Sequence, residues 1–196
     1  MSNNLIPEGF KDDVTSEVAT EHNFKNIIIS HFQLNGYDLV KTPLIDFFNP
    51  SEGQNVFQLL SKKKEKLSIR DDITLQVARL SKTRLSKKYP PLRLCYYGEV
   101  VRKKGTMLRP ERQFLQIGAE CIGVKSFLAD IEMIELAYSS LSLVGIKNIT
   151  LEISSRIFFD IFINEIKNLS LKKELKRIIK IKNLREICKL LDLKKQ

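Results

Sequence analysis

Leu92–Ile122 reads LRLCYYGEVVRKKGTMLRPERQFLQIGAECI, a stretch with two strand-like runs. The first run is Leu92–Arg102 and the second is Gln113–Ile122. Between them lies a basic segment with Gly105 and Pro110, residues that favour loops. Strands joined by a short loop pair as antiparallel neighbours. The sequence therefore predicts an antiparallel strand pair.

The segments on either side of this pair do not alternate as strand–helix–strand units. The expected helices are Val18–Leu34, which ends before Gly36, Asp72–Ser86, Leu128–Val144 and short helices within Ile157–Leu193. The expected strands are Tyr37–Thr42, Val56–Leu60 and Leu67–Arg70 as a hairpin, and Ile149–Ile153. The apolar helix Leu128–Val144 is expected to lie in the core. This order predicts an α+β fold, an antiparallel sheet flanked by helices, and argues against a Rossmann fold.

Two parts are expected, a core over residues 1–155 and a basic helical appendage over residues 156–196, broken near Asn168 and Asn183. The net charge is +10, and residues 167–196 hold eleven Lys or Arg against three acids, which leaves +2 for the rest. Because Ile and Leu accompany these cations at helical spacing, a solvated basic helix face explains the charge. Binding of tRNA or another polyanion by the helices of Lys172–Lys195 stays open as an alternative, and nucleic acid is not the favoured partner.

Composition argues against several other classes of protein. The chain has 196 residues, 43% of them hydrophobic, which suffices for the core of a soluble domain. It has no apolar run of about 18 residues and no secretion signal at Met1–Pro7, so a cytoplasmic protein without a membrane span is expected. Its three cysteines are odd in number, widely spaced and expected to be reduced: Cys95, Cys121 and Cys188. Since His22 and His31 share one predicted helix, no metal site, catalytic triad or cofactor is expected.

Polar residues follow one face of the second strand of the pair. Strand periodicity puts Phe114, Gln116, Gly118 and Glu120 on this face, with Arg112 in line. Because Gln and Glu among apolar neighbours need partners, two explanations stay open. In one, these side chains pair with Arg70 or Arg102 across the sheet. In the other, Arg102 receives an anion while Asp72, Thr74 and Glu120 accept from an ammonium group, a set that suits a small zwitterion.

Three segments, in the correct order, resemble class II aminoacyl-tRNA synthetases of the histidyl type. Tyr97–Gly123 is similar to motif 2, Gly36–Pro43 to the dimer-forming motif 1, and Arg70–Thr74 to the segment that holds the amino group of histidine. The resemblance implies a class II synthetase core and a histidine pocket. It assigns the α-amino group to Asp72 and Thr74, the carboxylate to Arg102, and the polar surroundings of the ligand to Gln116 and Glu120.

Within this group, the chain looks more like the regulatory subunits of ATP phosphoribosyltransferase. The opening Ile6–Asp12 and the stretch Asp72–Arg79 resemble that family, and Leu115 stands where the synthetase has histidine. The Arg-x-Glu of synthetase motif 2 becomes Arg102-Lys103-Lys104, which removes a carboxylate that helps to hold adenine. The resemblance implies a non-catalytic partner of a short-form catalytic subunit, with L-histidine as effector and a homodimer within a hetero-oligomer.

The resemblance thins after residue 155, and no counterpart of the synthetase's motif 3 precedes Gln196. We expect a core truncated at its C-terminal side, in which adenylate formation lacks a cation for the triphosphate. A histidyl-tRNA synthetase fragment is the alternative from the enzyme class. A solvated loop is the favoured explanation for the basic segment between the two strands. The alternative is phosphate binding, with three possible contacts: Lys104, Arg109 and Arg112.

Overall fold

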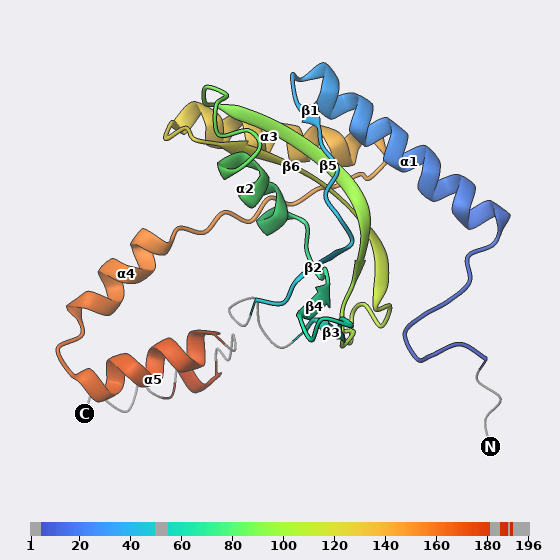
Figure 1. The fold of residues 1–196 in the computed structure, drawn as a ribbon. Helices are drawn as coiled ribbons and strands as arrows, with labels where there is room; N and C mark the ends of the chain where they lie inside the picture. The colour runs from blue at the N-terminus through green and yellow to red at the C-terminus, as the bar shows by residue number, and fades with distance from the viewer. Residues whose placement is uncertain (1–4, 50–54, 181–184, 188, 190–196) are drawn as a thin grey trace. The chain divides into compact units, whose positions relative to one another are not determined.

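The chain divides into two units, residues 1–149 and 150–196. The computed structural model describes residues 5–49, 55–180, 185–187 and 189 (Figure 1). In this part of the chain no helix is long and apolar enough to cross a membrane.

The first unit is built on the predicted strand pair. Strands β5 (Leu92–Val101) and β6 (Gln113–Ile122) are antiparallel along their full lengths, from Leu92 opposite Ile122 to Val101 opposite Gln113 (Figure 1). A two-residue strand, β1 (Asp38–Leu39), pairs with β5 in parallel, and the order is β1-β5-β6. The α+β fold is therefore confirmed, with a mixed sheet in place of a purely antiparallel one.

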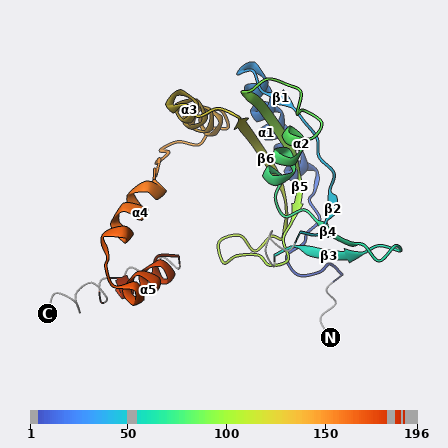
Figure 2. The ribbon, with the colours of Figure 1, turned by 60° about the vertical axis from the view of Figure 1, so that its left-hand side comes forward.

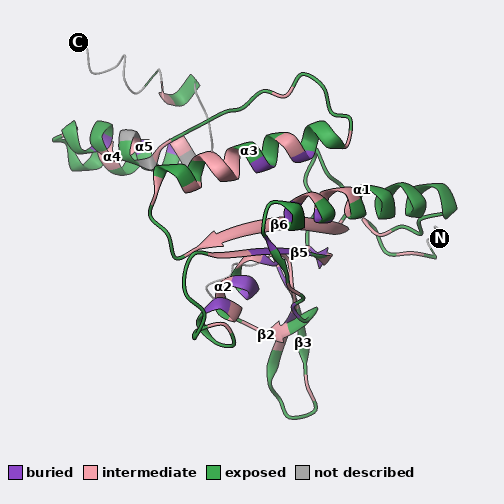
Figure 3. Ribbon diagram, turned by 90° about the horizontal axis from the view of Figure 1, so that it is seen from above, coloured by how far each residue is buried: buried purple, intermediate pink, exposed green. Residues whose placement is uncertain are grey.

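Helices cover both faces of this sheet (Figure 3). On one face, α1 (Thr15–Leu34) and α3 (Phe127–Leu143) enclose a core of Ile29, Phe32, Tyr37, Cys95 and Leu136. On the other face, α2 (Thr74–Lys82) covers a second core of Ile73, Val77, Leu94, Tyr96 and Val100. Helix α1 ends as expected, because Gly36 follows it with a φ of +83°.

Helix α3 is less buried than its apolar sequence predicts. Only Leu136 and Ser140 are buried, whereas Phe127 and Leu128 are 75% and 73% exposed. The expectation that the whole helix lies in the core is wrong, because one stripe of a helix suffices to cover α1 and the sheet.

A second, smaller sheet lies beside α2. It has the order β2-β4-β3 and is antiparallel throughout, with β2 (Ile45–Phe47), β3 (Phe57–Leu60) and β4 (Lys66–Ile69). Strands β3 and β4 form the expected hairpin (Figure 2). Its turn has no glycine, and Lys64 adopts the left-handed conformation that glycine usually takes, with a φ of 60°. Strand β2 was not expected from the sequence.

The second unit contains α4 (Arg156–Glu165) and α5 (Leu169–Lys180). Ile163, Leu175 and Ile178 are buried in it. The predicted break near Asn168 is confirmed, and the one near Asn183 lies outside the described residues. The strand expected at Ile149–Ile153 is wrong, because this segment pairs with no other strand in the described part of the chain and a lone extended segment forms no ladder.

Candidate functional site

The N-terminus of α2 brings Asp72 and Thr74 onto the face of β5 and β6. Ile73, which is 1% exposed, anchors this turn in the core between the two polar residues. The main-chain N–H of Thr74, the first residue of the helix, donates to Asp72 Oδ1 at 2.7 Å, a local bond between residues two positions apart. Asp72 and Thr74 are thereby fixed at the edge of an apolar cluster.

The register of β5 and β6 confirms the predicted face. Tyr96 lies opposite Gly118, and Gly98 lies opposite Gln116. Because alternate residues of a strand share a face, Gln116 and Glu120 lie on the α2 side together with Tyr96. The periodicity of the sequence was sufficient to place these side chains.

Gln116 joins β6 to the start of α2. Its Nε2 donates to Asp72 Oδ2 at 2.9 Å, and its Oε1 accepts from the main-chain N–H of Ile73 at 3.2 Å. Both oxygens of Asp72 therefore have a partner, and each keeps a further lone pair for a ligand. This half of the cluster can accept hydrogen bonds from an ammonium group.

Tyr96 joins the other two predicted residues. Its hydroxyl lies 3.0 Å from Thr74 Oγ1 and donates to Glu120 Oε1 at 3.2 Å. Tyr96 is 3% exposed, and this burial raises the pKa of its hydroxyl to about 12. Sequence reasoning missed Tyr96. Gly118 leaves room for the Tyr96 ring, since a Cβ there would lie 2.5 Å from Tyr96 Oη.

Arg102 lies at one end of the same face. Its guanidinium is 5.0 Å from the centre of the Phe114 ring, and its main-chain N–H donates to the Arg112 carbonyl at 2.7 Å. Among the described residues it forms no hydrogen bond with Asp72, Thr74, Gln116 or Glu120. The structure thus joins four of the five predicted pocket residues by hydrogen bonds and places the fifth beside Phe114.

The three basic loop residues have different surroundings. Lys104 is exposed, and its main-chain N–H donates to Asn55 Oδ1 at 3.0 Å. Arg109 is exposed and lies 4.3 Å from the centre of the Phe114 ring. Arg112 donates to the carbonyls of Glu8 and Arg102. Lys104 and Arg112 line one pocket and Arg109 lines another, so the three do not converge.

Arg112 also packs against two aromatic rings. Its guanidinium lies 4.9 Å from the centre of Phe10 and 4.8 Å from that of Phe57. These contacts, like the carbonyl bonds, give Arg112 a structural role that links the N-terminal segment to β3.

Arg70 fills a structural position that the sequence did not reveal. It donates to the carbonyls of Thr42 and Glu99, at 3.0 and 2.8 Å, and it crosses Gly98, where a Cβ would lie 2.1 Å from its Nη2. Burial lowers the pKa of Arg70. Its partners are therefore main-chain oxygens and the Thr42 hydroxyl, the latter at 3.1 Å, in contrast to the carboxylate pairing that the sequence left open.

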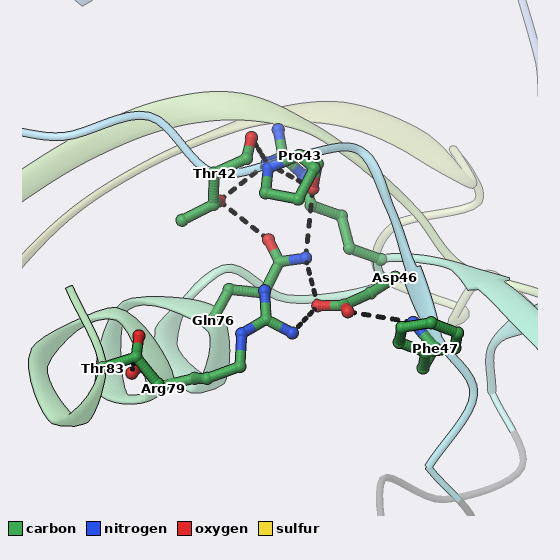
Figure 4. A network of polar contacts seen from close by, with 8 residues as sticks. Thr42, Pro43, Asp46, Phe47, Gln76, Arg79 and Thr83 are labelled. Atoms are coloured by element: carbon green, nitrogen blue, oxygen red, sulfur yellow. Dashed lines mark hydrogen bonds and ion pairs between the residues drawn. The ribbon is translucent and has the colours of Figure 1, made fainter.

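A network of hydrogen bonds next to Arg70 connects α2 to β2 and to the loop before β2, which contains Thr42 and Pro43 (Figure 4). Gln76 is 6% exposed; its Oε1 accepts from Thr42 Oγ1 at 2.8 Å, and its Nε2 donates to Asp46 Oδ2 at 3.0 Å. Arg79 also donates to Asp46 Oδ2. Burial opposes ionisation of Asp46, but these bonds and the main-chain N–H of Phe47 outweigh it and lower its pKa. The network holds α2 in place.

The described residues contain no group of three or more His, Cys, Asp or Glu arranged to hold a metal ion. Cys95 and Cys121 are free thiols, and Cys188 lies outside the described residues. The chemistry that the cluster offers is hydrogen bonding and charge recognition.

Comparison with known families gives one match over most of the chain. The family model described as histidyl-tRNA synthetase matches residues 9–196. Among curated proteins, the ATP phosphoribosyltransferase regulatory subunit of Rhodospirillum centenum is 39% identical over 158 residues, which are 76% of this chain and 41% of that protein. The subunit of the same name from Chromobacterium violaceum is 34% identical over 161 residues, 78% of this chain and 42% of that protein.

Solved structures agree on the fold. A structure from Bacillus halodurans described as an ATP phosphoribosyltransferase regulatory subunit/histidyl-tRNA synthetase matches with a TM-score of 0.81 and 26% identity, over 93% of this chain and 49% of that one. The histidyl-tRNA synthetase of Nostoc sp. PCC 7120 matches in fold, with a TM-score of 0.64 and 20% identity over 93% of this chain and 48% of that one. The chain spans about two fifths of the length of the two curated relatives.

Proposed function

The chain belongs to the histidyl-tRNA synthetase family, with a class II synthetase-like core, and on that premise we propose that it is a non-catalytic regulatory subunit of ATP phosphoribosyltransferase that binds L-histidine. The observation that carries the proposal is the hydrogen-bonded cluster of Asp72, Thr74, Gln116 and Glu120 beneath the start of α2. The names of the relatives from Rhodospirillum centenum and Chromobacterium violaceum support the regulatory role.

The cluster has the chemistry to bind an amino acid. Asp72 and Thr74 present oxygens that can accept from an ammonium group, and Arg102 at the end of the face supplies a cation for a carboxylate. Glu120 presents a further carboxylate oxygen for a donor on the ligand side chain. A ligand with an ammonium group, a carboxylate and an N–H donor, such as histidine, matches this set.

A non-catalytic role fits the residues that stand where a synthetase contacts ATP. Lys104 cannot accept a hydrogen bond from the adenine amino group, because an ammonium group has donors only. Nor do Lys104, Arg109 and Arg112 converge on one site for phosphates. We expect no histidine-dependent exchange between ATP and pyrophosphate, and measurable exchange would support a synthetase-related enzyme instead.

Regulation requires that histidine bind one state of the complex more tightly than another. In this proposal the partner is the short-form catalytic subunit, and a homodimer of this chain forms part of the complex. The test is co-expression with that subunit, followed by its transferase activity with and without histidine. Activity or histidine inhibition that depends on this chain supports the proposal, and equal activity and equal insensitivity without the chain overturn it.

A further inference from the structure

Tyr96 connects the two ends of the proposed histidine pocket. Its hydroxyl lies between Thr74, at the end assigned to the amino group, and Glu120, at the end assigned to the ligand side chain. Tyr96 itself lies in the core cluster with Ile73 and Leu94. It therefore acts on a ligand only through the two residues that it contacts.

The direction of these two hydrogen bonds follows from the hydrogens available. A tyrosine hydroxyl has one hydrogen, and a carboxylate only accepts, so the Tyr96 hydrogen goes to Glu120 Oε1. The contact between Thr74 and Tyr96 then requires the Thr74 hydroxyl to donate to the Tyr96 oxygen. Because burial raises the pKa of Tyr96 to about 12, Tyr96 keeps its hydrogen at neutral pH.

These two hydrogen bonds, from Thr74 to Tyr96 and from Tyr96 to Glu120, form a relay that determines whether the Thr74 hydroxyl can donate to a ligand or only accept from it. A threonine hydroxyl has one hydrogen and two lone pairs. With its hydrogen committed to Tyr96, Thr74 can only accept. Asp72 beside it also only accepts, since Gln116 and the Thr74 N–H both donate to it. The amino-group end of the pocket is thus a pair of acceptors, which fits a group with several hydrogens, such as an ammonium.

We infer that Tyr96 is a positioning residue that makes the pocket selective for ligands with a protonated amino group. The inference rests on the proposed function, because it concerns the same pocket. Without the Tyr96 hydroxyl, the Thr74 hydroxyl is free to rotate and to turn its hydrogen toward the ligand. The pocket then no longer presents acceptors alone at this end, so it discriminates less against ligands without an amino group.

The test compares L-histidine with imidazolepropionate, which keeps the ring and the carboxylate but lacks the amino group. Isothermal titration gives both dissociation constants for the wild type, Tyr96→Phe and the matched control Tyr97→Phe. Tyr97 undergoes the same chemical change on the opposite face of β5, where it is 40% exposed. We expect Tyr96→Phe to lower the preference for histidine by about fivefold and Tyr97→Phe to leave it unchanged.

The ratio of the two dissociation constants distinguishes a positioning role of Tyr96 from general damage to the fold, because a loosened fold weakens the binding of both ligands alike. In a Thr74→Val background, Tyr96→Phe should not change the ratio further, since the relay acts through the Thr74 hydroxyl. If circular dichroism shows that Tyr96→Phe does not fold, Thr74→Val alone decides the matter, and an unchanged ratio in it overturns the inference.

The remaining outcomes distinguish the two proposals. A wild-type chain that binds histidine while Tyr96→Phe keeps the wild-type ratio overturns the role of Tyr96 and leaves the histidine pocket intact. A ratio that still falls with Tyr96→Phe in the Thr74→Val background overturns the relay. A wild-type chain that binds neither ligand overturns the histidine pocket, and the inference about Tyr96 falls with it.

Discussion

The side-chain amide of Gln116 donates to the Asp72 carboxylate at 2.9 Å, across 44 positions of sequence. This bond and the bond from the Ile73 N–H to Gln116 Oε1 attach the first turn of α2 to β6. The same residues that resemblance assigns to the ligand therefore also hold the start of the helix. Substitutions in the pocket should change stability as well as binding.

Gln116→Ala should show both effects. It leaves the Ile73 N–H without its partner, so we expect the free energy of unfolding to fall by about 1–3 kcal/mol and histidine binding to weaken. Urea unfolding and isothermal titration measure the two effects. The control is Gln58→Ala on the exposed side of β3, which should change neither. Equal stability of Gln116→Ala and the control would contradict the role of this amide.

Gly118→Ala tests the close contact between β6 and Tyr96. The added methyl group would lie 2.5 Å from Tyr96 Cζ, so the ring must move, and we expect a loss of about 1–3 kcal/mol in the free energy of unfolding. In a Tyr96→Leu background the aromatic ring is gone, and Gly118→Ala should cost much less. Additive losses in the double variant would argue against the contact as the cause.

The ion pair between Arg93 and Glu132 predicts a pH dependence of stability. Arg93 binds both carboxylate oxygens at 2.7 Å, and Tyr37 also donates to Glu132, so the pKa of Glu132 falls from 4.5 to about 2. A depressed carboxyl pKa stabilises the folded state above the unfolded value of 4.5, and this contribution disappears as the pH falls toward about 2.

Glu132→Gln should therefore flatten the dependence of the free energy of unfolding on pH between about 2 and 4.5. Glu135→Gln, an exposed position on the same helix, is the control and should retain the slope of the wild type. Urea unfolding at a series of acidic pH values gives the slopes. A Glu132→Gln slope equal to that of the wild type would show that this ion pair does not contribute.

The network around Gln76 should be among the most sensitive polar sites in the first unit. Gln76→Leu removes three hydrogen bonds and leaves the Pro43 carbonyl and Thr42 hydroxyl without this partner, so we expect a loss of about 2–3 kcal/mol. Gln33→Leu on the exposed side of α1 is the matched control, with an expected change within about 0.5 kcal/mol. Thermal and urea unfolding provide the comparison, and similar stabilities of the two variants would refute the role of the network.

The long elements of the fold could be predicted from the sequence because their periodicity is strong. The strand predicted at Gln113–Ile122 has the observed ends, and the alternation of its residues correctly predicts that Gln116 and Glu120 share one face. The local sequence pattern did not predict strands correctly where strand formation depends on pairing with a neighbouring strand. Ile45–Phe47 is a strand because β4 pairs with it, and Ile149–Ile153 alternates apolar and polar residues but has no strand partner among the described residues.

The candidate site was predictable only in part. Strand alternation and side-chain chemistry point to Asp72, Thr74, Gln116 and Glu120, resemblance alone assigns them to histidine, and the structure joins them by hydrogen bonds, Glu120 through Tyr96. The side chain that connects two of them, Tyr96, could not be identified from sequence, since its bonds to Thr74 and Glu120 span 22 and 24 positions. Such contacts depend on how α2 packs on the sheet, which no local pattern encodes.

Isothermal titration of the purified chain with L-histidine is the decisive experiment for the proposal that this chain binds histidine in the cluster under α2. Arg102→Ala is measured beside the wild type, because this residue supplies the cation proposed for the ligand carboxylate. We expect saturable binding by the wild type that is lost or greatly weakened in Arg102→Ala. The absence of any heat of binding at millimolar histidine, or equal affinity in the variant, would contradict it.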